Sequence, residues 1–296
     1  MTNRRAAAVR NNRKAGQGSL AIVCGGGTIP VSVAESARKA GRRVVLYPLR
    51  GVANDPRIAK YPHHWVAVGQ IGRLARVIKS EGCRDVVFIG SIVRPSLWQI
   101  RFDWHSVREL PRLVAAFRGG DDHLLSSLGK IAESFGLRAM GAHEVAPNIL
   151  LPAGTLTRKR PSARDYADIA RGFKVLQSIG KFDVGQAVVV ADSRVLAIEG
   201  IDGTDEMLAH LYEMRRRHRL RIREGIGVLV KAIKPGQNRR YDMPAVGPKT
   251  VIAAAKAGLA GIAVVAGETV VAEPERMIAA ADRAKLFVVG VRKKSR

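Results

Sequence analysis

The segment from Lys231 to Thr250, KAIKPGQNRRYDMPAVGPKT, combines several cations with a carboxylate. It follows the apolar run 226–230, which is typical of a buried strand, and its prolines and glycines exclude a regular helix or a central strand. Arg and Lys neutralise phosphate oxygens, and the carboxylate of Asp242 can hold Mg²⁺ or orient water. The segment is typical of a site that binds phosphate and acts on it. A solvated basic loop whose Asp242 pairs with an arginine explains the same residues equally well. Its candidate cations are Lys231, Arg239 and Arg240.

A second cluster, EGIDGTD at residues 199–205, follows one expected strand and precedes an expected helix. Thr204 can cap that helix from Asp205 onward, and backbone amides around Gly203 can bind phosphate. Asp202 or Asp205 can ligate a metal ion. A capping loop with exposed acids is the competing interpretation.

A glycine-rich turn, GGGTIP, lies between the apolar run Leu20–Cys24 and an expected helix at Val31–Ala40. Its glycines let a ligand approach the backbone, and the start of the helix favours an anion. The spacing is not GxGxxG, and no acidic residue follows the next strand, Val44–Tyr47, closely enough to hold a ribose. The turn therefore predicts a nucleotide or phosphate site without an NAD fingerprint. The residues expected there are Gly25, Gly26 and Thr28.

Two further sites of this kind are expected in the first half of the chain. The apolar strand Asp85–Ile89 ends on GSIVRP, where Ser91 and Arg94 are candidate ligands if the segment is more than a structural turn. Asp121 and Asp122 precede an expected helix and either cap it or hold a cation near phosphate.

The elements that position these residues alternate between strand and helix, which predicts an α/β fold with a doubly wound, mostly parallel sheet over residues 19–151. Residues 152–161 read as a linker, and 162–296 form a second α/β domain. Residues 1–18 are expected to be a basic, disordered tail. Residues 97–118 mix aromatic and basic side chains. A packed helix with a basic outer face is favoured there over a segment that binds lipid at an interface. Other strands are expected at 66–68, 137–140, 186–191, 194–199, 262–266 and 286–291, an edge element at 143–151, and helices at 71–81, 123–135, 163–179, 207–223, 251–257 and 274–284.

Composition limits the function classes. The chain has 296 residues, 47% of them hydrophobic, which suits two packed domains. Its net charge of +25 predicts attraction to nucleic acid or to an anionic membrane face, but aromatics are only 5% and no nucleic-acid-binding motif is present. No apolar run reaches the ~20 residues of a spanning helix, and the N-terminus lacks a secretory signal. Cys24 and Cys83 read as reduced core residues of a cytosolic protein, without a zinc pattern.

Taken together and in order, five motifs resemble the LpxI-type UDP-2,3-diacylglucosamine diphosphatases of lipid A biosynthesis. They are GGGTIP, GSIVRP, GGDDHLL, DVGQAVVVADSRVLAIEGIDGTDEML and QNRRYDMPAVGPKT with its preceding lysine. The resemblance extends over roughly Leu20–Val291, and it is specific because five motifs keep their order.

The resemblance implies Mg²⁺-dependent hydrolysis of UDP-2,3-diacylglucosamine to UMP and 2,3-diacylglucosamine 1-phosphate (lipid X) at the cytoplasmic face of the inner membrane. It implies a Rossmann-like N-terminal domain, a C-terminal α/β domain, lipid held between them, and a homodimer. Asp242 falls on the catalytic aspartate, and Gln186 falls in the DVGQ motif and is expected to bind substrate. The loop expected to contact phosphate, sugar or metal is Asp202, Gly203, Thr204 and Asp205. Asn238 stands where the family usually has aspartate, which puts a metal or base role there in doubt.

A non-catalytic nucleotide- or lipid-binding module on a Rossmann-like scaffold is the alternative, because a fold does not dictate a function. Asp242 and the carboxylates of the loop from Asp202 to Asp205 distinguish a hydrolase from such a module, since a binding module needs no carboxylate beside its phosphate site.

Overall fold

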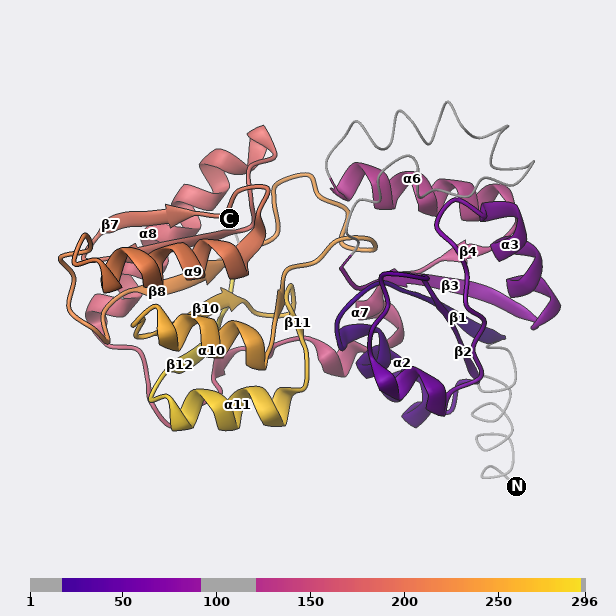
Figure 1. Cartoon of the computed structure of the whole chain (residues 1–296), viewed down its shortest axis with the longest axis horizontal. Helices are drawn as coiled ribbons and strands as arrows, with labels where there is room; N and C mark the ends of the chain where they lie inside the picture. Colours follow the sequence, from indigo (N-terminus) through magenta and orange to yellow (C-terminus); the bar gives the residue numbers. More distant parts are fainter. Residues whose placement is uncertain (1–17, 92–120, 294–296) are drawn as a thin grey trace, which may run out of the picture. The chain divides into compact units, whose positions relative to one another are not determined.

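The computed structural model describes residues 18–91 and 121–293 (Figure 1). The expected tail, Arg94 and the aromatic and basic stretch at 97–118 lie outside the described residues. The chain divides into two compact units. The N-terminal unit comprises residues 1–147 and 240–242, and the C-terminal unit comprises 148–239 and 243–296. A three-residue segment from the middle of the Lys231–Thr250 loop thus belongs with the N-terminal unit.

The N-terminal unit contains a four-stranded parallel sheet in the order β2-β1-β3-β4, which confirms the predicted doubly wound arrangement. Its helices α3 and α6 pack on one face of the sheet, and α2 and α7 lie together on the other (Figure 1). Its elements are β1 (Ser19–Cys24), α2 (Ile29–Lys39), β2 (Val44–Pro48), η1 (Pro56–Lys60), α3 (Ile71–Ser80), β3 (Cys83–Ile89), α6 (Asp121–Ser134), β4 (Arg138–Ala139) and α7 (Ala142–Val145).

Two predicted elements of this unit are wrong. No strand forms at Val66–Val68, where the only pairing is an isolated bridge from Leu49 to Val66. The edge element expected at 143–151 is instead the short helix α7 followed by the 3-10 turn η3 (Pro147–Ile149). Short apolar runs such as these do not distinguish a strand from a buried turn.

Both cysteines are free and buried in the N-terminal unit, as predicted. Burial raises the pKa of the Cys24 thiol to about 12, so it stays protonated and unreactive at neutral pH.

The C-terminal unit contains a six-stranded mixed sheet in the order β5-β12-β10-β8-β6-β7. Strands β8, β10 and β12 are parallel, while β5, β6 and β7 pair antiparallel with their neighbours. Its elements are β5 (Gly154–Thr155), α8 (Ala163–Ile179), η4 (Gly180–Phe182), β6 (Ala187–Ala191), β7 (Arg194–Ile198), α9 (Gly203–Arg216), β8 (Val228–Lys231), β9 (Ala245–Val246), α10 (Pro248–Lys256), β10 (Gly261–Val265), β11 (Val270–Val271), α11 (Pro274–Arg283) and β12 (Phe287–Val291).

Alternating residues of these strands serve two cores. Val189, Leu229 and Ile262 pack with α9, α10 and α11, whereas Val188, Val230 and Ala263 pack with α8. The first three helices therefore cover one face of the sheet and α8 covers the other (Figure 1).

Residues 152–161, expected to be a linker, instead contribute β5 to this sheet, where it pairs with β12. The unit boundary falls between Pro147 and Asn148. Among the described residues, no helix is long and apolar enough to cross a membrane.

Helix α9 differs most from its prediction at both ends. It begins at Gly203, four residues before the first apolar residue of its periodic pattern, and it ends at Arg216. The C-terminal end of the helix is set by contacts with distant residues. The Arg215 guanidinium donates hydrogen bonds to the backbone carbonyls of Ile222, at 2.5 Å, and Ala257, at 3.0 Å. These bonds hold the segment after the helix against α9. His218 then adopts a left-handed φ of 53° that stops the helix.

Candidate functional site

Lys231 is the last residue of β8 and lies at the carboxyl end of a parallel strand, where α/β sheets bind ligands. The residue is only 7% exposed. Its Nζ donates hydrogen bonds to Thr204 Oγ1 at 2.8 Å and to the Ala245 carbonyl at 3.3 Å. A buried ammonium group is costly unless such acceptors hold it, so the position of this charge is fixed by the fold.

Glu199, just after β7, completes a hydrogen-bonded chain with these two residues. The Thr204 hydroxyl donates to Glu199 Oε1, and Glu199 Oε2 accepts from the Gln186 backbone N–H at 2.6 Å. Glu199 is 9% exposed, so a buried carboxylate offsets a buried ammonium through one intervening hydroxyl. We call this arrangement the Lys231–Thr204–Glu199 chain. It links the ends of β7 and β8 to the first turn of α9.

The DVGQ segment packs closely against the same residue, Glu199. A Cβ placed on Gly185 would lie 2.3 Å from the Glu199 carbonyl oxygen, so only glycine fits there. The Gly185 N–H donates to that carbonyl at 3.2 Å, and the Gln186 carbonyl accepts from Ala232 at 3.0 Å. Gln186 is therefore positioned between the end of β8 and the start of the acidic loop.

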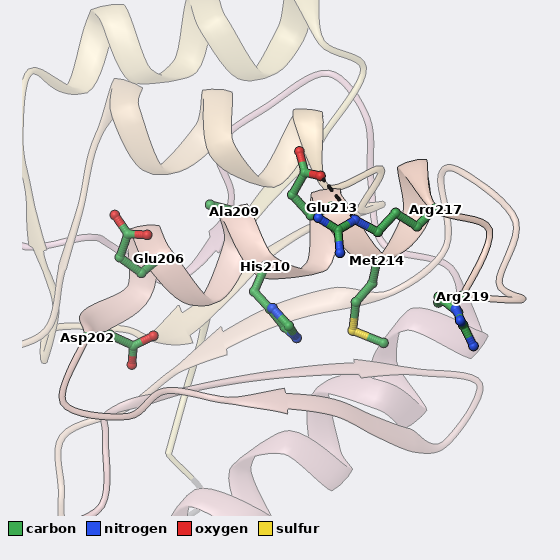
Figure 2. Close-up of a pocket in the computed structure, with 8 residues that line it drawn as sticks. All are labelled: Asp202, Glu206, Ala209, His210, Glu213, Met214, Arg217 and Arg219. Atoms are coloured by element: carbon green, nitrogen blue, oxygen red, sulfur yellow. Dashed lines mark ion pairs between the residues drawn. The ribbon is translucent and has the colours of Figure 1, made fainter.

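The structure corrects the predicted capping role of Thr204. The N-cap of α9 is Asp202, which makes no side-chain capping bond, and Thr204 lies in the first turn with its hydroxyl donated to Glu199. Asp202 and Asp205 are exposed at this end of the helix. Asp202 also lines a groove of about 810 Å³ along α9, where its side chain lies near that of Glu206 (Figure 2).

The glycine-rich turn of the N-terminal unit is explained by close packing of two turns. A Cβ on Gly25 would lie 2.5 Å from the Ser91 carbonyl oxygen and 2.8 Å from the Gly90 carbonyl carbon. Gly26 and Ser91 exchange backbone hydrogen bonds, and the Gly27 N–H donates to Asn54 Oδ1 at 3.1 Å. These amides already have protein acceptors, so the phosphate site predicted at Gly25, Gly26, Thr28 and Ser91 stays a prediction.

Residues 240–242 are anchored in the N-terminal unit by Tyr241, which belongs to its hydrophobic core. Burial raises the pKa of the Tyr241 phenol. The guanidinium Nη1 of Arg240 lies 3.7 Å from Glu133 Oε1, and its Cζ lies 5.3 Å from the centre of the Tyr241 ring. Asp242 follows directly and is half-buried.

Arg239 belongs with the C-terminal unit, where it donates to the Gly267 carbonyl at 2.7 Å. The predicted constellation of Lys231, Arg240 and Asp242 is thus divided between the two units, and its assembly into one site stays a prediction.

The remaining predicted residues are placed only in part. Asp121 and Asp122 lie in the first turn of α6 and do not precede it, because the helix begins at Asp121. Arg94 lies outside the described residues.

Sequence reasoning did not single out Glu199, although an acid directly after a strand and before glycine was a usable signal. Its importance depends on β7, β8 and α9 meeting, which no local pattern shows.

Comparison with known proteins agrees with this two-part organisation. Residues 19–149 match the family model of the LpxI N-terminal domain, and residues 152–289 match that of the LpxI C-terminal domain. The chain is also 40% identical, over 272 residues, to a Caulobacter vibrioides protein named UDP-2,3-diacylglucosamine pyrophosphatase LpxI. That alignment covers 92% of this chain and 97% of the relative.

Proposed function

The chain belongs to the LpxI family, and from that premise we propose that it hydrolyses the diphosphate of UDP-2,3-diacylglucosamine to UMP and 2,3-diacylglucosamine 1-phosphate, lipid X. The observation that carries the proposal within the fold is the Lys231–Thr204–Glu199 chain. It fixes a buried cation at a strand's carboxyl end, where a phosphate needs charge compensation.

In this proposal Lys231 binds a phosphate oxygen and stabilises the charge that develops as the phosphorus–oxygen bond breaks. Thr204 and Glu199 act through Lys231, because the hydroxyl accepts from the ammonium while donating to the carboxylate. Gln186, Gly203 and Arg240 remain proposed substrate contacts, as do the glycine-rich turn, Ser91, Arg94, Asp121 and Asp122.

Asp242 is proposed to orient the attacking water. The water oxygen forms a new bond to phosphorus as it gives a proton to Asp242, the bridging P–O bond breaks, and the two products each leave with a phosphate group. Asp242 suits this role because Tyr241 is fixed in a hydrophobic core and so limits the freedom of its neighbour.

Mg²⁺ is proposed as the cofactor, with Asp202, Asp205 and Asp242 as the residues that would hold it. Within the described residues, no three His, Cys, Asp or Glu side chains are grouped closely enough to hold a metal ion by themselves. Asp202 and Asp205 are exposed and Asp242 is half-buried, and these carboxylates fit the other mode that Mg²⁺ uses, in which one or two carboxylates share the ion with substrate phosphates and water. When bound, it would offset phosphate charge.

We also propose that the protein is cytoplasmic and peripheral on the inner membrane, and that it is a homodimer. The net charge of +25 supports attraction to anionic lipid, while the low aromatic content of 5% and the lack of a nucleic-acid-binding motif in the sequence argue against a specific nucleic acid. Arg221 and Arg223 are exposed and have no ion-pair partner among the described residues. Binding to anionic vesicles is expected to weaken as salt rises, whereas binding that ignores salt would contradict this part.

The hydrolase proposal is tested by incubating purified protein with UDP-2,3-diacylglucosamine and Mg²⁺ and measuring UMP release. Asp242→Ala is expected to lower turnover by about 10²–10⁴-fold, the range for losing a group that manages the reacting proton, while substrate still binds. Asp282→Ala in α11 is the matched control and should keep turnover.

Binding without UMP release by the unmodified protein would support the alternative of a nucleotide- or lipid-binding module. Near-normal turnover in Asp242→Ala would reject the role of that carboxylate while leaving the hydrolase proposal standing.

A further inference from the structure

The sheet of the C-terminal unit has two unlike edges. Strand β5 has only two residues, whereas β7 at the other edge has five, RVLAI, and among the described residues no strand pairs with its outer side. Val195 and Ile198 of β7 are 40% and 42% exposed, and Arg194 is its only charged residue. Edge strands are normally protected by shortness, charge, proline or a β-bulge. β5 is protected by its shortness. β7 has one charged residue and one register shift, between Val189 and Val190 of β6, but its other four residues are apolar, so it is the less protected of the two edges.

Helix α9 packs against β7 at this edge. It buries Met207, Leu208 and Leu211 against the core, next to α10 in the layer of helices. Its outer side forms the groove of about 810 Å³. His210 and Met214 point from the helix toward the β6–β7 hairpin (Figure 2). The groove is lined by Asp202, Glu206, Ala209, His210, Glu213, Met214, Arg217 and Arg219.

The ends of this groove carry opposite charges. Asp202 and Glu206 lie at its start, and Arg217 and Arg219 lie at its end, with Ala209 and Met214 between them. Glu213 is already paired with Arg216 and Arg217. A partner that fits the groove therefore needs cations opposite the first end, acids opposite the second, and a strand that can extend the sheet.

We propose that this partner is a second copy of the same chain, joined through β7 and α9 about a two-fold axis perpendicular to the sheet. Such an axis pairs the two β7 strands antiparallel and sets the two α9 helices antiparallel on the same face. The acidic end of one groove then meets the basic end of the other, and the apolar edge residues are covered. A groove with opposite charges at its two ends is self-complementary under this operation, which a partner of another kind would match only by chance.

The proposal names the surface of the homodimer put forward above. Its test needs no substrate, so it can fail while the hydrolase proposal stands, and the reverse also holds.

The first experiment is sedimentation velocity of the full chain at tens of micromolar. The unmodified protein is expected to sediment as twice its 32.0 kDa mass, and Val195→Lys/Ile198→Lys as a monomer with an unchanged circular dichroism spectrum. The matched control, Lys249→Glu/Lys256→Glu, alters exposed charges of α10 outside the groove and should remain dimeric. A monomeric unmodified protein, or a dimeric edge variant, would overturn the proposal.

A second experiment exchanges charges. Asp202→Lys/Glu206→Lys and Arg217→Glu/Arg219→Glu are each expected to raise the dimer dissociation constant by at least about tenfold, because like charges then face one another. An equimolar mixture of the two variants should regain the affinity of the unmodified protein, since every facing pair is again opposite in sign. If mixing restores nothing, the antiparallel groove-to-groove arrangement is wrong.

If the edge variant fails to fold, cross-linking replaces it. His210 lies in the middle of α9, so the two copies of Cys in His210→Cys should be joined by a short bis-maleimide. The native cysteines are buried, and the unmodified protein is the control. Cross-linking of His210→Cys no greater than that of the control would also reject the interface.

Discussion

The two units both bury charged side chains, but at opposite ends of their strands. In the N-terminal unit, Asp85 near the start of β3 is 4% exposed and accepts hydrogen bonds from Arg42, at 2.5 Å, and from Arg138, at 2.8 and 3.0 Å. In the C-terminal unit, Lys231 ends β8 and is linked to Glu199 through the Thr204 hydroxyl. Both arrangements balance a buried charge, yet the first joins its ions directly and the second separates them.

This difference separates a structural charge from a functional one. Burial alone would raise the pKa of Asp85, but the hydrogen bonds from Arg138 and Arg42 outweigh it and hold the pKa below its usual value. The carboxylate is thereby saturated, and it sits away from the strand ends where α/β sheets bind ligands. Lys231 lies at such an end and is held by a hydroxyl and a carbonyl, both weaker partners than a carboxylate. We therefore expect changes at Asp85 to affect stability and changes at Lys231 to affect turnover.

Asp85→Ala gives the largest expected effect. It leaves Arg42 buried without its partner, which should lower the free energy of unfolding of the N-terminal unit by about 3–5 kcal/mol. Residues 148–296 contain no tryptophan, and Trp65 lies in the described part of the N-terminal unit, so urea unfolding followed by tryptophan fluorescence reports on that unit. The control is Glu35→Ala, which removes an exposed partner of Arg57 and should cost less than about 1 kcal/mol. Equal urea midpoints for Asp85→Ala and Glu35→Ala would show that the buried carboxylate of Asp85 is no more important for stability than an exposed one.

Lys231→Met tests whether the buried cation at the end of β8 serves turnover. Losing a fixed cation at the phosphate should reduce kcat by about 10²–10³-fold, or about 2.7–4 kcal/mol of activation free energy. Arg42→Met is the matched control, because it also removes a buried cation but should change only the fraction of folded protein. Turnover per folded molecule, from UMP release and circular dichroism together, distinguishes them. The interpretation fails if both variants lose turnover equally.

The sequence predicted the elements whose signals are local. Helix α8 begins and ends where expected, because Ser162 and Asp165 form a capping box at its start. The strands expected at 186–191 and 194–199 also form, joined by a hairpin turn at Asp192 and Ser193, and the Asp168 carboxylate of α8 accepts hydrogen bonds from the backbone N–H groups of both turn residues. Capping and turn chemistry involve residues close in sequence, so a single chain reveals them.

The rest depends on contacts between distant segments. The end of α9 is set by Arg215 reaching Ala257, 42 residues away, and periodicity alone extended the helix seven residues too far. The role of Glu199 follows from β6 pairing with both β7 and β8, which brings the ends of all three strands together. The grouping of Tyr241 with the N-terminal core is also non-local. Apart from the acid that directly follows β7, these features had no local signal to predict them.

Thr204→Val and Thr204→Ser sharpen the role of the bridging hydroxyl. Valine keeps the shape of threonine but can neither accept a hydrogen bond from Lys231 nor donate one to Glu199. The loss of about 1.5–3 kcal/mol of transition-state stabilisation should lower kcat/KM by about 13- to 160-fold. Serine retains the hydroxyl and should recover most of the loss. A structural role alone would show as a lower melting temperature with unchanged kinetics of the folded enzyme. Equal kinetics for valine and serine would therefore reject the chain as a positioning device.

The smallest expected effect is the acid sensitivity of the N-terminal unit. Because the pKa of Asp85 is lower in the folded chain than in the unfolded one, the unfolded chain binds a proton that the folded chain does not, in the interval between the two values. The stabilisation is complete above the unfolded pKa of about 3.9 and is lost as the pH falls toward the folded value, with a slope of at most about 1.4 kcal/mol per pH unit. Asp85→Asn cannot ionise, so its tryptophan-detected stability should change less between pH 5 and about 2 than that of the unmodified protein. If the free energy of unfolding of Asp85→Asn and that of the unmodified protein fall in parallel as the pH is lowered, the acid sensitivity comes from other carboxylates. The Asp85 ion pairs would then not account for the pH dependence of the stability of this unit.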